Sequence, residues 1–314
     1  MRAVAVRKFK DVPEMMDLPK PEPGPGEILV KLGAAGVNPY DWKIVDGVLD
    51  GVMPHVFPLI LGVDGAGVVE TCGPGASRFK PGMGVYGQFI HPPAGIGTYA
   101  EYVTAPESLA IAEIPRGIYT AQAAAVPTPA MTALAALDAL NLHKGQTLFV
   151  AGAKGGIGSF VVQLGSNQGI MVMAASRGDH GAFLRKLGAF LYIDAGRYGY
   201  LEEFRTGHPE GVDAALDLFH PAAEFEPIAG LVKPGGIAAS TIGAAGSVPT
   251  DARGVHRVNV DLAPKMEYLE RLGKEISTGR LRIPLEAQLP LAEAPEIVAQ
   301  SRAGSSRGKT VLLI

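Results

Sequence analysis

Cysteine and net charge are nearly absent from this chain. Cys72 is the single cysteine among 314 residues, so there is no internal disulfide and no cysteine pair for a structural zinc site. The net charge at pH 7 is only −3, so the basic field that would hold nucleic acid or an anionic membrane is missing. No apolar run reaches the length of a membrane span, and the first residues lack the apolar core of a signal peptide. We therefore expect a small-molecule partner, no nucleic acid, no membrane and a cytoplasmic location.

Apolar residues, in contrast, are plentiful and follow two patterns. Hydrophobic residues make up 47% of the sequence, which is enough for two domains with separate cores. The first third contains short β-rich runs between Gly and Pro clusters, at 27–32, 63–72, 84–89 and 98–104. An alanine-rich helix is expected over 120–140, and beyond it strands alternate with helices.

The alternating part predicts a parallel sheet. Its expected strands are 147–151, 170–174, 190–193, 214–218 and 236–241, the last after a Lys-Pro-Gly-Gly turn, and a final strand is expected at 310–314. The predicted fold class is therefore α/β, with a β domain and a doubly wound parallel-sheet domain.

Residues 147–158 carry the most informative motif. A β-branched and aromatic run, TLFVA, leads into the glycine-rich turn GAKGGIG and then into a helix expected over 157–168. Backbone N–H groups at such a helix N-terminus bind phosphate, and glycine lets the phosphate approach the backbone closely. Gly155 and Gly158 fill two positions of the G-x-G-x-x-G fingerprint, and Ala153 stands at the first. The candidate phosphate-binding residues are Ala153, Lys154, Gly155, Gly156, Ile157 and Gly158.

The end of the next strand indicates which dinucleotide binds. An NAD site would have an Asp or Glu about 20 residues past the turn to receive the ribose 2′-hydroxyl, and no acid stands there. Ser176, Arg177 and His180 follow the strand instead, and their hydroxyl, guanidinium and imidazole suit a 2′-phosphate. We therefore predict NADP(H) as the cofactor. The alternative is that Ser176 and Arg177 belong to a polar loop and that Asp179 turns toward a ribose.

Several segments, taken in order, resemble the medium-chain dehydrogenase/reductase superfamily, and within it the zinc-free quinone and enone reductases related to ζ-crystallin. The landmarks are 36–43 (GVNPYDWK), 61–69 (LGVDGAGVV), 97–103 (GTYAEYV), 131–137 (MTALAAL) and the glycine turn. The resemblance covers essentially the full length. It implies a GroES-like catalytic β domain formed by residues 1–118 and 265–314, around an inserted Rossmann NADP-binding domain at 119–264. It also implies a homodimer formed through the sheet edge of the cofactor domain.

The same resemblance extends the cofactor site. It adds Thr128, the pair Ile242 and Gly243, whose backbone would face the nicotinamide carboxamide, and Arg307 near the C-terminus. Asp217, at the expected carboxyl edge of the sheet, is interpreted as a brace for its loop.

Compared with the zinc alcohol dehydrogenases of this superfamily, the chain lacks the metal ligands. This chain has Asn38 where those enzymes have their first ligand, a Cys. It has Val63 and Asp64 where they have His-Glu, and their third ligand, a second Cys, falls near Thr128. Catalytic zinc needs about three N, S or O ligands, so no metal is expected. Without that Lewis acid, the interconversion of a simple alcohol and ketone lacks its main electrophile. When hydride adds to a conjugated acceptor, the negative charge spreads to an oxygen that hydrogen bonds can stabilise. We predict hydride transfer from NADPH to a quinone or an α,β-unsaturated carbonyl compound.

The candidate catalytic residues lie in the NPYDWK segment. Asn38 resembles a family residue near the nicotinamide, and its alternative role is a turn residue. Lys43 resembles a lysine near cofactor and substrate in the plant enone oxidoreductase branch, where its ammonium would receive the developing enolate; the alternative is a surface lysine. Asp41 is expected to orient one of these groups or to pair with Lys43. Tyr40, like Tyr99, is either a phenol donor or a packing residue.

A few other side chains complete the expectations. Phe57, Ile60, Phe89 and Phe219 either line an apolar cleft or belong to the core, and His91 is expected to be solvated. Two other functions stay open at this point: an enoyl-thioester reductase, and a non-catalytic NADP(H)-binding protein with a structural or regulatory role.

Overall fold

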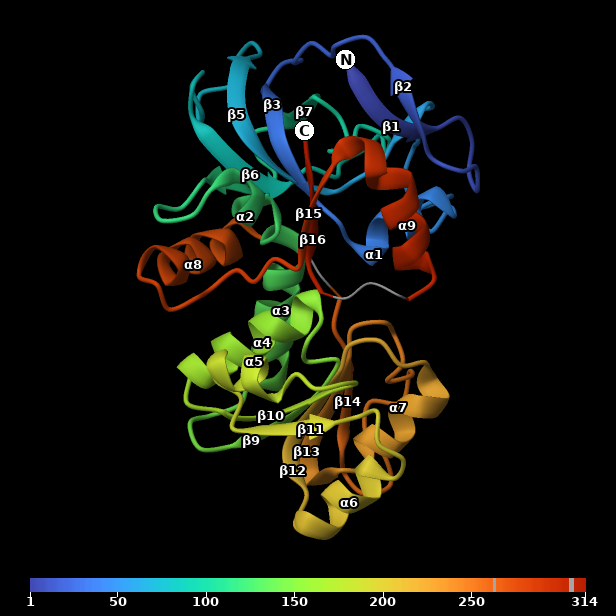
Figure 1. Cartoon of the computed structure of the whole chain (residues 1–314), viewed down its shortest axis with the longest axis vertical. Coiled ribbons are helices and arrows are strands. Elements are labelled where there is room, and N and C mark those ends of the chain that lie inside the picture. Colours follow the sequence, from blue (N-terminus) through green and yellow to red (C-terminus); the bar gives the residue numbers. More distant parts are fainter. Residues whose placement is uncertain (262–263, 305–307) are drawn as a thin grey trace. The chain divides into compact units, whose positions relative to one another are not determined.

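The computed structural model describes residues 1–261, 264–304 and 308–314, which divide into two compact units. Unit 1 consists of Met1–Thr128, Pro264–Gly279 and Ile283–Ile314, and unit 2 of Pro129–Ala263 and Arg280–Arg282. Figure 1 labels the elements of both.

Unit 1 is built on strands that pair antiparallel, except for the parallel pair β15 and β16. These are β1 (Arg2–Val6), β2 (Glu14–Asp17), β3 (Glu27–Gly36), β4 (Leu59–Ile60), β5 (Asp64–Cys72), β6 (Gly84–Gln88), β7 (Tyr102–Pro106), β8 (Ile111–Glu113), β15 (Ala287–Pro290) and β16 (Thr310–Leu313). Strands β2, β1 and β4 form a small sheet in that order, and a larger sheet has the order β15-β16-β3-β5-β6-β8, with β7 also paired to β3. Strand β3 alternates in the way a half-buried strand requires, because Ile28, Val30 and Leu32 point into a core that also holds Val69 and Val85.

Four helices of the described residues accompany these sheets in unit 1. They are α1 (Pro39–Val45), α2 (Thr120–Ala124), α8 (Met266–Ser277) and α9 (Ala294–Arg302), the last preceded by the 3-10 turn η1 (Leu291–Glu293). Helix α8 buries Leu269, Leu272 and Ile276, which recur at helical spacing. Figure 1 shows α1 beside α9, and an ion pair of 2.6 Å between Asp46 and Arg302 joins them.

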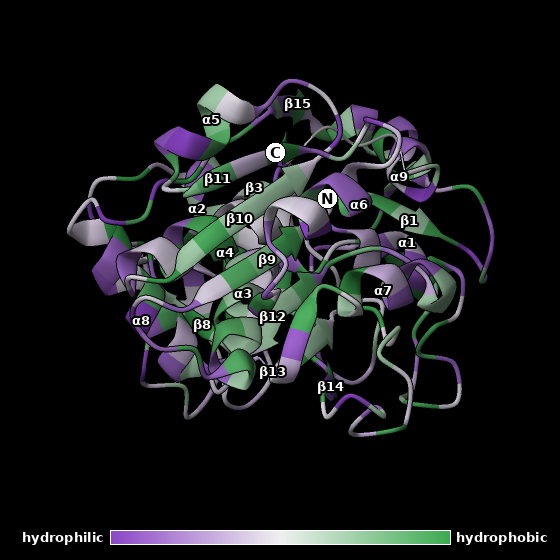
Figure 2. Ribbon diagram, turned by 90° about the horizontal axis from the view of Figure 1, so that it is seen from below, coloured by the Kyte–Doolittle hydropathy of each residue, from purple (hydrophilic) through white to green (hydrophobic). Residues whose placement is uncertain are grey.

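Unit 2 is a parallel sheet with helices packed against it. Its strands are β9 (Thr147–Ala151), β10 (Met171–Ser176), β11 (Leu191–Asp194), β12 (Val212–Asp217), β13 (Val232–Ser240) and β14 (His256–Asn259), and its helices are α4 (Gly156–Asn167), α5 (Gly181–Lys186), α6 (Tyr200–Gly207), α7 (Ala222–Ala229) and most of α3 (Pro127–Leu140). Figure 2 shows these mostly apolar strands with the helices around them. The strand order is β11-β10-β9-β12-β13-β14, and every pair is parallel. Ligands bind such sheets at the carboxyl ends of the strands where the order reverses, beside β9 and β12.

The predicted fold class is confirmed, and the elements around the glycine turn lie where the sequence placed them. Strand β9 matches the expected range, and α4 begins one residue earlier than expected. Three other expectations were wrong in detail. The helix expected over 120–140 is two helices, because Pro127 has no N–H to continue α2 and instead begins α3.

The other two errors concern strands. The strand expected at 98–104 begins only at Tyr102, because the N–H groups of Thr98 and Tyr99 donate to the carbonyls of Gly62 and Leu61 rather than to β3. Strand β13 begins at Val232, so it includes the Lys-Pro-Gly-Gly segment that was expected to precede it. A register shift against β12 accommodates this segment within the strand. Strand β14 was not predicted.

Candidate functional site

The turn between β9 and α4 is shaped by its glycines. Gly152 has a φ of +87°, which only glycine adopts freely. A Cβ on Gly158 would lie 2.4 Å from the carbonyl oxygen of Gly152 and 2.6 Å from Cα of Ala153, so the helix and the turn can approach this closely only because Gly158 has no side chain. This cradle is the close backbone packing that the fingerprint predicts.

The amides of the turn divide into two groups. The N–H groups of Gly152 and Ala153 both donate to Ala175 O at 3.0 Å, which fixes the turn to β10. Gly156, Ile157 and Gly158 form the first turn of the twelve-residue helix α4, where backbone N–H groups have no acceptor inside the helix. The positive end of the helix dipole therefore points to the carboxyl edge of the sheet, where a pyrophosphate would bind.

A buried polar atom lies next to this turn. The Ser176 hydroxyl at the end of β10 is buried, and the described residues offer it no hydrogen-bond partner. Arg177 follows it and is exposed, and His180 is partly exposed at the start of α5. A buried hydroxyl without a partner is costly unless something hydrogen-bonds to it, which makes this corner a fit for a polar ligand group.

An acid does lie close to this corner, but on the neighbouring strand. Asp194 ends β11 opposite Ser176, and its Oδ1 accepts the N–H groups of Gly178 at 3.1 Å and Gly196 at 2.9 Å. Its carboxylate therefore holds two loops together. The sequence reasoning about β10 did not consider this residue, because the pairing of β10 with β11 places it there.

The remaining predicted cofactor residues differ in their surroundings. Ile242 is 43% exposed and donates its N–H to Ser240 Oγ, while Gly243 has a φ of +82°. Thr128 belongs to unit 1, where its hydroxyl donates to Asp64 Oδ1 at 2.6 Å. Arg307 lies outside the described residues. The Oδ1 atom of Asp217 accepts N–H groups of the loop that follows it, as its expected bracing role requires.

Unit 1 contains a buried polar network that centres on Lys309. The Lys309 ammonium donates to Asn38 Oδ1 at 2.8 Å and to Val37 O at 2.9 Å, and it lies 4.0 Å from Asp64 Oδ2. Asn38 in turn donates to Asp64 Oδ2 at 2.9 Å, and both oxygens of Asp64 accept hydrogen bonds from Thr128. Gln88 donates to the Thr128 hydroxyl at 2.6 Å. Of the residues compared with the zinc ligands, Asn38 and Thr128 are thus hydrogen-bonded to Asp64 beside a lysine, whereas Val63 donates its N–H to Asp41.

Burial controls the charges of this network. It raises the pKa of Asp64, against the opposing effects of the Lys309 charge and the hydrogen bonds from Thr128 and Asn38. Burial also lowers the pKa of Lys309, while the carboxylates of Asp64 and Asp41 act in the opposite direction. The ammonium and the two carboxyl groups therefore depend on one another for their ionised forms.

Asp41 is the second buried carboxyl group of unit 1. Its Oδ2 accepts the N–H of Asn38 at 2.7 Å and the Tyr99 hydroxyl at 2.8 Å, and its Oδ1 accepts the N–H of Val63 at 3.2 Å. Tyr99 reaches this position because it packs against Gly62, where a Cβ would lie 2.3 Å from the ring. Burial raises the pKa of Asp41 to about 7, and the hydrogen bonds from Asn38 and Tyr99 limit the rise.

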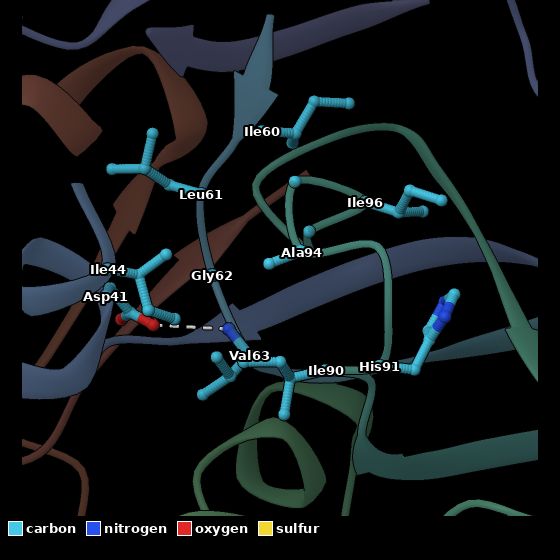
Figure 3. Close-up of a pocket in the computed structure, with 12 residues that line it drawn as sticks. Asp41, Ile44, Ile60, Leu61, Gly62, Val63, Ile90, His91, Ala94 and Ile96 are labelled. Carbon is cyan, nitrogen blue, oxygen red and sulfur yellow. Dashed lines mark hydrogen bonds between the residues drawn. The ribbon is translucent and has the colours of Figure 1, made fainter. Parts of the chain in front are cut away.

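A pocket opens beside Asp41. Its lining residues are mostly apolar: Asp41, Ile44, Ile60, Leu61, Gly62, Val63, Ile90, His91, Ala94, Gly95, Ile96 and Gly97. Figure 3 shows a carboxylate oxygen of Asp41 directed at the backbone nitrogen of Val63, which donates a hydrogen bond to it. Two of the twelve lining residues have titratable side chains, Asp41 and His91.

The other candidate side chains take different positions. No hydrogen bond or ion pair joins Lys43 to Asp41 within the described chain, because residues two apart on a helix do not face each other. The Lys43 ammonium lies 5.7 Å from the centre of the Trp42 ring. Tyr40 is partly buried against the core, and burial raises its pKa. The structure thus brings Asn38 and Asp41 together, and leaves Lys43 and Tyr40 outside the pocket lining.

The burial of His91 and of the four candidate cleft residues tests what the sequence predicted for them. His91 is buried rather than solvated, because its ring nitrogens lie against the carbonyls of Pro92 at 3.1 Å and Thr104 at 3.4 Å. Phe89 is fully buried in a core, whereas Ile60 lines the pocket. Phe57 and Phe219 are partly exposed, Phe57 against the Phe9 ring and Phe219 over Gly152.

Sequence reasoning missed Lys309 and the central place of Asp64. A possible signal was a lysine directly before the apolar run TVLLI, since a charge beside a buried strand needs a partner. The partner could not be named, because Asn38 and Lys309 are 271 positions apart.

Comparisons with known proteins agree with this architecture. Residues 24–116 match the alcohol dehydrogenase GroES-like domain, and residues 187–312 match the family described as zinc-binding dehydrogenase. The chain is 31% identical to the chloroplast envelope quinone oxidoreductase homolog of Arabidopsis thaliana, over 95% of this chain and 93% of that protein. It is 28% identical to the trans-enoyl reductase pgmF of Aspergillus terreus, over 93% and 87%.

Solved structures support the same assignment. An NAD-dependent alcohol dehydrogenase superposes over the full length of both chains with a TM-score of 0.87 and 28% identity. A mycobacterial protein determined in complex with NADPH superposes over the full length of both chains with a TM-score of 0.84 and 25% identity. The fold and the site define an oxidoreductase that uses a nicotinamide cofactor. The chain belongs to the quinone oxidoreductase branch of the medium-chain dehydrogenase/reductase superfamily.

Two further features are absent from the described residues. No helix of the described chain is long and apolar enough to span a membrane. No group of three or more His, Cys, Asp and Glu side chains that could hold a metal ion is found in the ranges that the structure describes.

Proposed function

We propose that this protein is an NADPH-dependent, zinc-independent reductase of quinones or α,β-unsaturated carbonyl compounds. The observation that carries the proposal is the network around Lys309. In a zinc dehydrogenase a metal ion would polarise the substrate oxygen, whereas Asn38, Asp64 and Thr128 are already hydrogen-bonded to one another here. The Lys309 ammonium lies 4.0 Å from Asp64 Oδ2 and would repel a second cation. These residues do not fit zinc.

The polarity of the pocket supports a conjugated acceptor. Its apolar wall suits the carbon frame of a quinone or enone, and hydride addition to such a frame spreads negative charge to an oxygen that needs only hydrogen-bond donors. The nicotinamide cofactor supplies the hydride when bound, and Gly158, the amides of the glycine turn and Ser176 are the groups that would hold it.

The acceptor class is tested with a matched pair of substrates. We expect the protein to reduce an α,β-unsaturated ketone with NADPH and to leave the corresponding saturated ketone unchanged, at the same rate before and after EDTA treatment. The measurement is NADPH absorbance combined with product analysis. Reduction of the saturated ketone, or loss of activity with EDTA that zinc restores, would show that the proposed chemistry is wrong.

NADPH preference rests on the corner after β10. The buried Ser176 hydroxyl, the exposed Arg177 and the absence of an acid at the end of β10 favour a 2′-phosphate, and Asp194 is occupied by two backbone N–H groups. Arg177→Asp is expected to weaken NADPH binding about 10- to 100-fold, the loss of one charge-assisted contact, with NADH binding nearly unchanged. Fluorescence titration with both cofactors measures this, and Arg116→Asp, an exposed arginine in unit 1, is the control for net charge. An equal loss for both cofactors would remove Arg177 from the 2′-phosphate site.

Lys43 lies outside the pocket lining, and its proposed role beside the enolate rests on the resemblance of the NPYDWK segment to the plant enone oxidoreductase branch. Lys43→Met is expected to lower turnover while leaving cofactor affinity unchanged. Turnover equal to that of the wild type would make Lys43 a bystander.

A second candidate function is the reduction of an enoyl thioester, which the trans-enoyl reductase relative favours. The protein would then turn over an enoyl thioester and fail with quinones and simple enones. Tight NADPH binding without turnover of any of these acceptors would support a non-catalytic binding role instead.

We also propose a homodimer in a reducing, cytoplasmic compartment. Strand β14 is one edge of the six-stranded sheet in unit 2, where residues 249–250 pair with His256 and Arg257 on its outer side. The proposed dimer brings this edge to the β14 edge of a second copy. Light scattering of the purified protein tests the dimer, and a monomer at micromolar concentration would contradict it.

A further inference from the structure

The carboxyl group of Asp41 occupies an unusual position for an acid. It lines an apolar pocket, on the first turn of α1, and its exposed fraction is 1%. We propose that Asp41 is the proton donor that protonates the reduced acceptor in this pocket. This inference rests on the proposed function, because hydride transfer leaves an anion that needs a proton and the inference names the donor.

The hydrogen bonds of Asp41 determine which groups can accept its proton. All three partners that the structure gives it are donors: Asn38 N–H and Tyr99 O–H to Oδ2, and Val63 N–H to Oδ1. A protonated carboxyl group therefore has no acceptor among these neighbours. The group that accepts its proton has to come from the pocket that Asp41 lines.

His91 is the other titratable group of the pocket lining, and it is held differently. Both of its ring nitrogens lie against backbone carbonyls, at 3.1 Å and 3.4 Å. A neutral imidazole has one N–H, and whichever ring nitrogen of His91 carries it donates to a backbone carbonyl, whereas the O–H of a protonated Asp41 has no acceptor among its partners. This difference favours Asp41 as the donor.

The charges around Asp41 suit an acid that works near neutral pH. Burial raises its pKa to about 7, and the negative charge of Asp64 acts in the same direction. The hydrogen bonds from Asn38 and Tyr99 and the positive charge of Lys309 act in the opposite direction. Burial raises the pKa of Tyr99 well above its usual range, so Tyr99 stays a neutral donor. Acids are most effective when their pKa lies near the working pH.

The proposed reaction combines hydride addition with proton transfer from Asp41. Hydride from NADPH adds to the β-carbon of the enone, and the electron pair of the C=C bond moves into an enolate. The O–H bond of Asp41 breaks and its proton bonds to the α-carbon, or to the phenolate oxygen when the acceptor is a quinone. Asp41 remains as a carboxylate and takes a new proton from solvent, so that NADPH, one proton and the acceptor give NADP⁺ and the reduced product.

The test is the pH dependence of turnover with NADPH and an α,β-unsaturated ketone. In the wild type, turnover is expected to be highest at low pH and to fall as the pH rises through about 7, where Asp41 loses its proton. Asp41→Asn cannot donate a proton, so its turnover is expected to be about 10²- to 10⁴-fold lower and to lack this inflection.

Two neighbouring variants should move the inflection in opposite directions. Tyr99→Phe removes a hydrogen bond that favours the carboxylate, so the inflection is expected about half to one pH unit higher. Asp64→Asn removes a like charge, so the inflection is expected at lower pH. Tyr86→Phe is the matched control, because its buried hydroxyl donates to Leu269 O and lines no part of the pocket.

The outcomes separate this inference from the proposed function. If the wild type reduces no conjugated acceptor, the proposed function falls and the inference falls with it. If the wild type is active but Asp41→Asn is equally active, or if Tyr99→Phe and Asp64→Asn keep the wild-type inflection, the proposed function stands and Asp41 is not the donor. The pH profiles of Tyr99→Phe and Asp64→Asn decide whether Asp41 is the donor even if Asp41→Asn does not fold.

Discussion

Lys309→Met is expected to lower the free energy of unfolding by about 3–5 kcal/mol. The side chain of Lys309 is 5% exposed, and its ammonium hydrogen-bonds to Asn38 Oδ1 and Val37 O beside the Asp64 carboxylate. Methionine fills a similar volume but supplies no charge and no donor. The substitution would therefore leave a buried carboxylate without its compensating cation and two buried acceptors without a donor.

Urea unfolding at pH 7 measures this difference, and two variants control it. Lys31→Met changes an exposed lysine on β3 and is expected to alter stability by no more than about 0.5 kcal/mol. The double variant Lys309→Met with Asp64→Asn removes both charges and should recover part of the loss, since the penalty comes from leaving one partner alone. A Lys309→Met protein as stable as the wild type would show that the network contributes little.

Gly158→Ala is expected to weaken cofactor binding by about 100-fold or more. The added Cβ would lie 2.4 Å from Gly152 O and 2.6 Å from Cα of Ala153, and both are backbone atoms that cannot rotate away. The turn would have to move apart from α4, and the amides that face the pyrophosphate would lose their alignment. Loss of two charge-assisted hydrogen bonds at about 1.5–3 kcal/mol each accounts for that factor.

Titration of the protein with NADPH, followed by fluorescence, measures the affinity, and circular dichroism checks that the fold is kept. Gly207→Ala is the matched control in unit 2, because a Cβ there meets nothing within 4 Å. Unchanged affinity in Gly158→Ala would contradict the assignment of this turn as the phosphate cradle.

The sequence predicted best what depends on neighbouring residues. Strand β9, the turn and α4 follow from a short apolar run, glycine spacing and helical periodicity, and all of these are local signals. The break between α2 and α3 was also local, at Pro127, but the alanine-rich pattern on both sides concealed it. Strand β13 was misread because the register shift that admits its glycines depends on pairing with β12.

The polar network could not be predicted in the same way. Asp64, Asn38 and Lys309 meet only because β16 pairs with β3 and β3 pairs with β5, and no pattern within any one segment reveals these contacts. The sequence named Asn38 and Asp41 as candidates and expected Asp41 to orient Asn38 or Lys43, or to pair with Lys43; Asp41 does accept the N–H of Asn38. Their partners in the structure are Lys309, Asp64 and Tyr99, which lie far away along the chain.

The measurement that tests the central claim most directly is the steady-state oxidation of NADPH and of NADH by the purified protein, with one reactive o-quinone as acceptor. The proposed function predicts turnover with NADPH at a clearly higher kcat/KM than with NADH. Absence of turnover with either cofactor, or a preference for NADH, would contradict it.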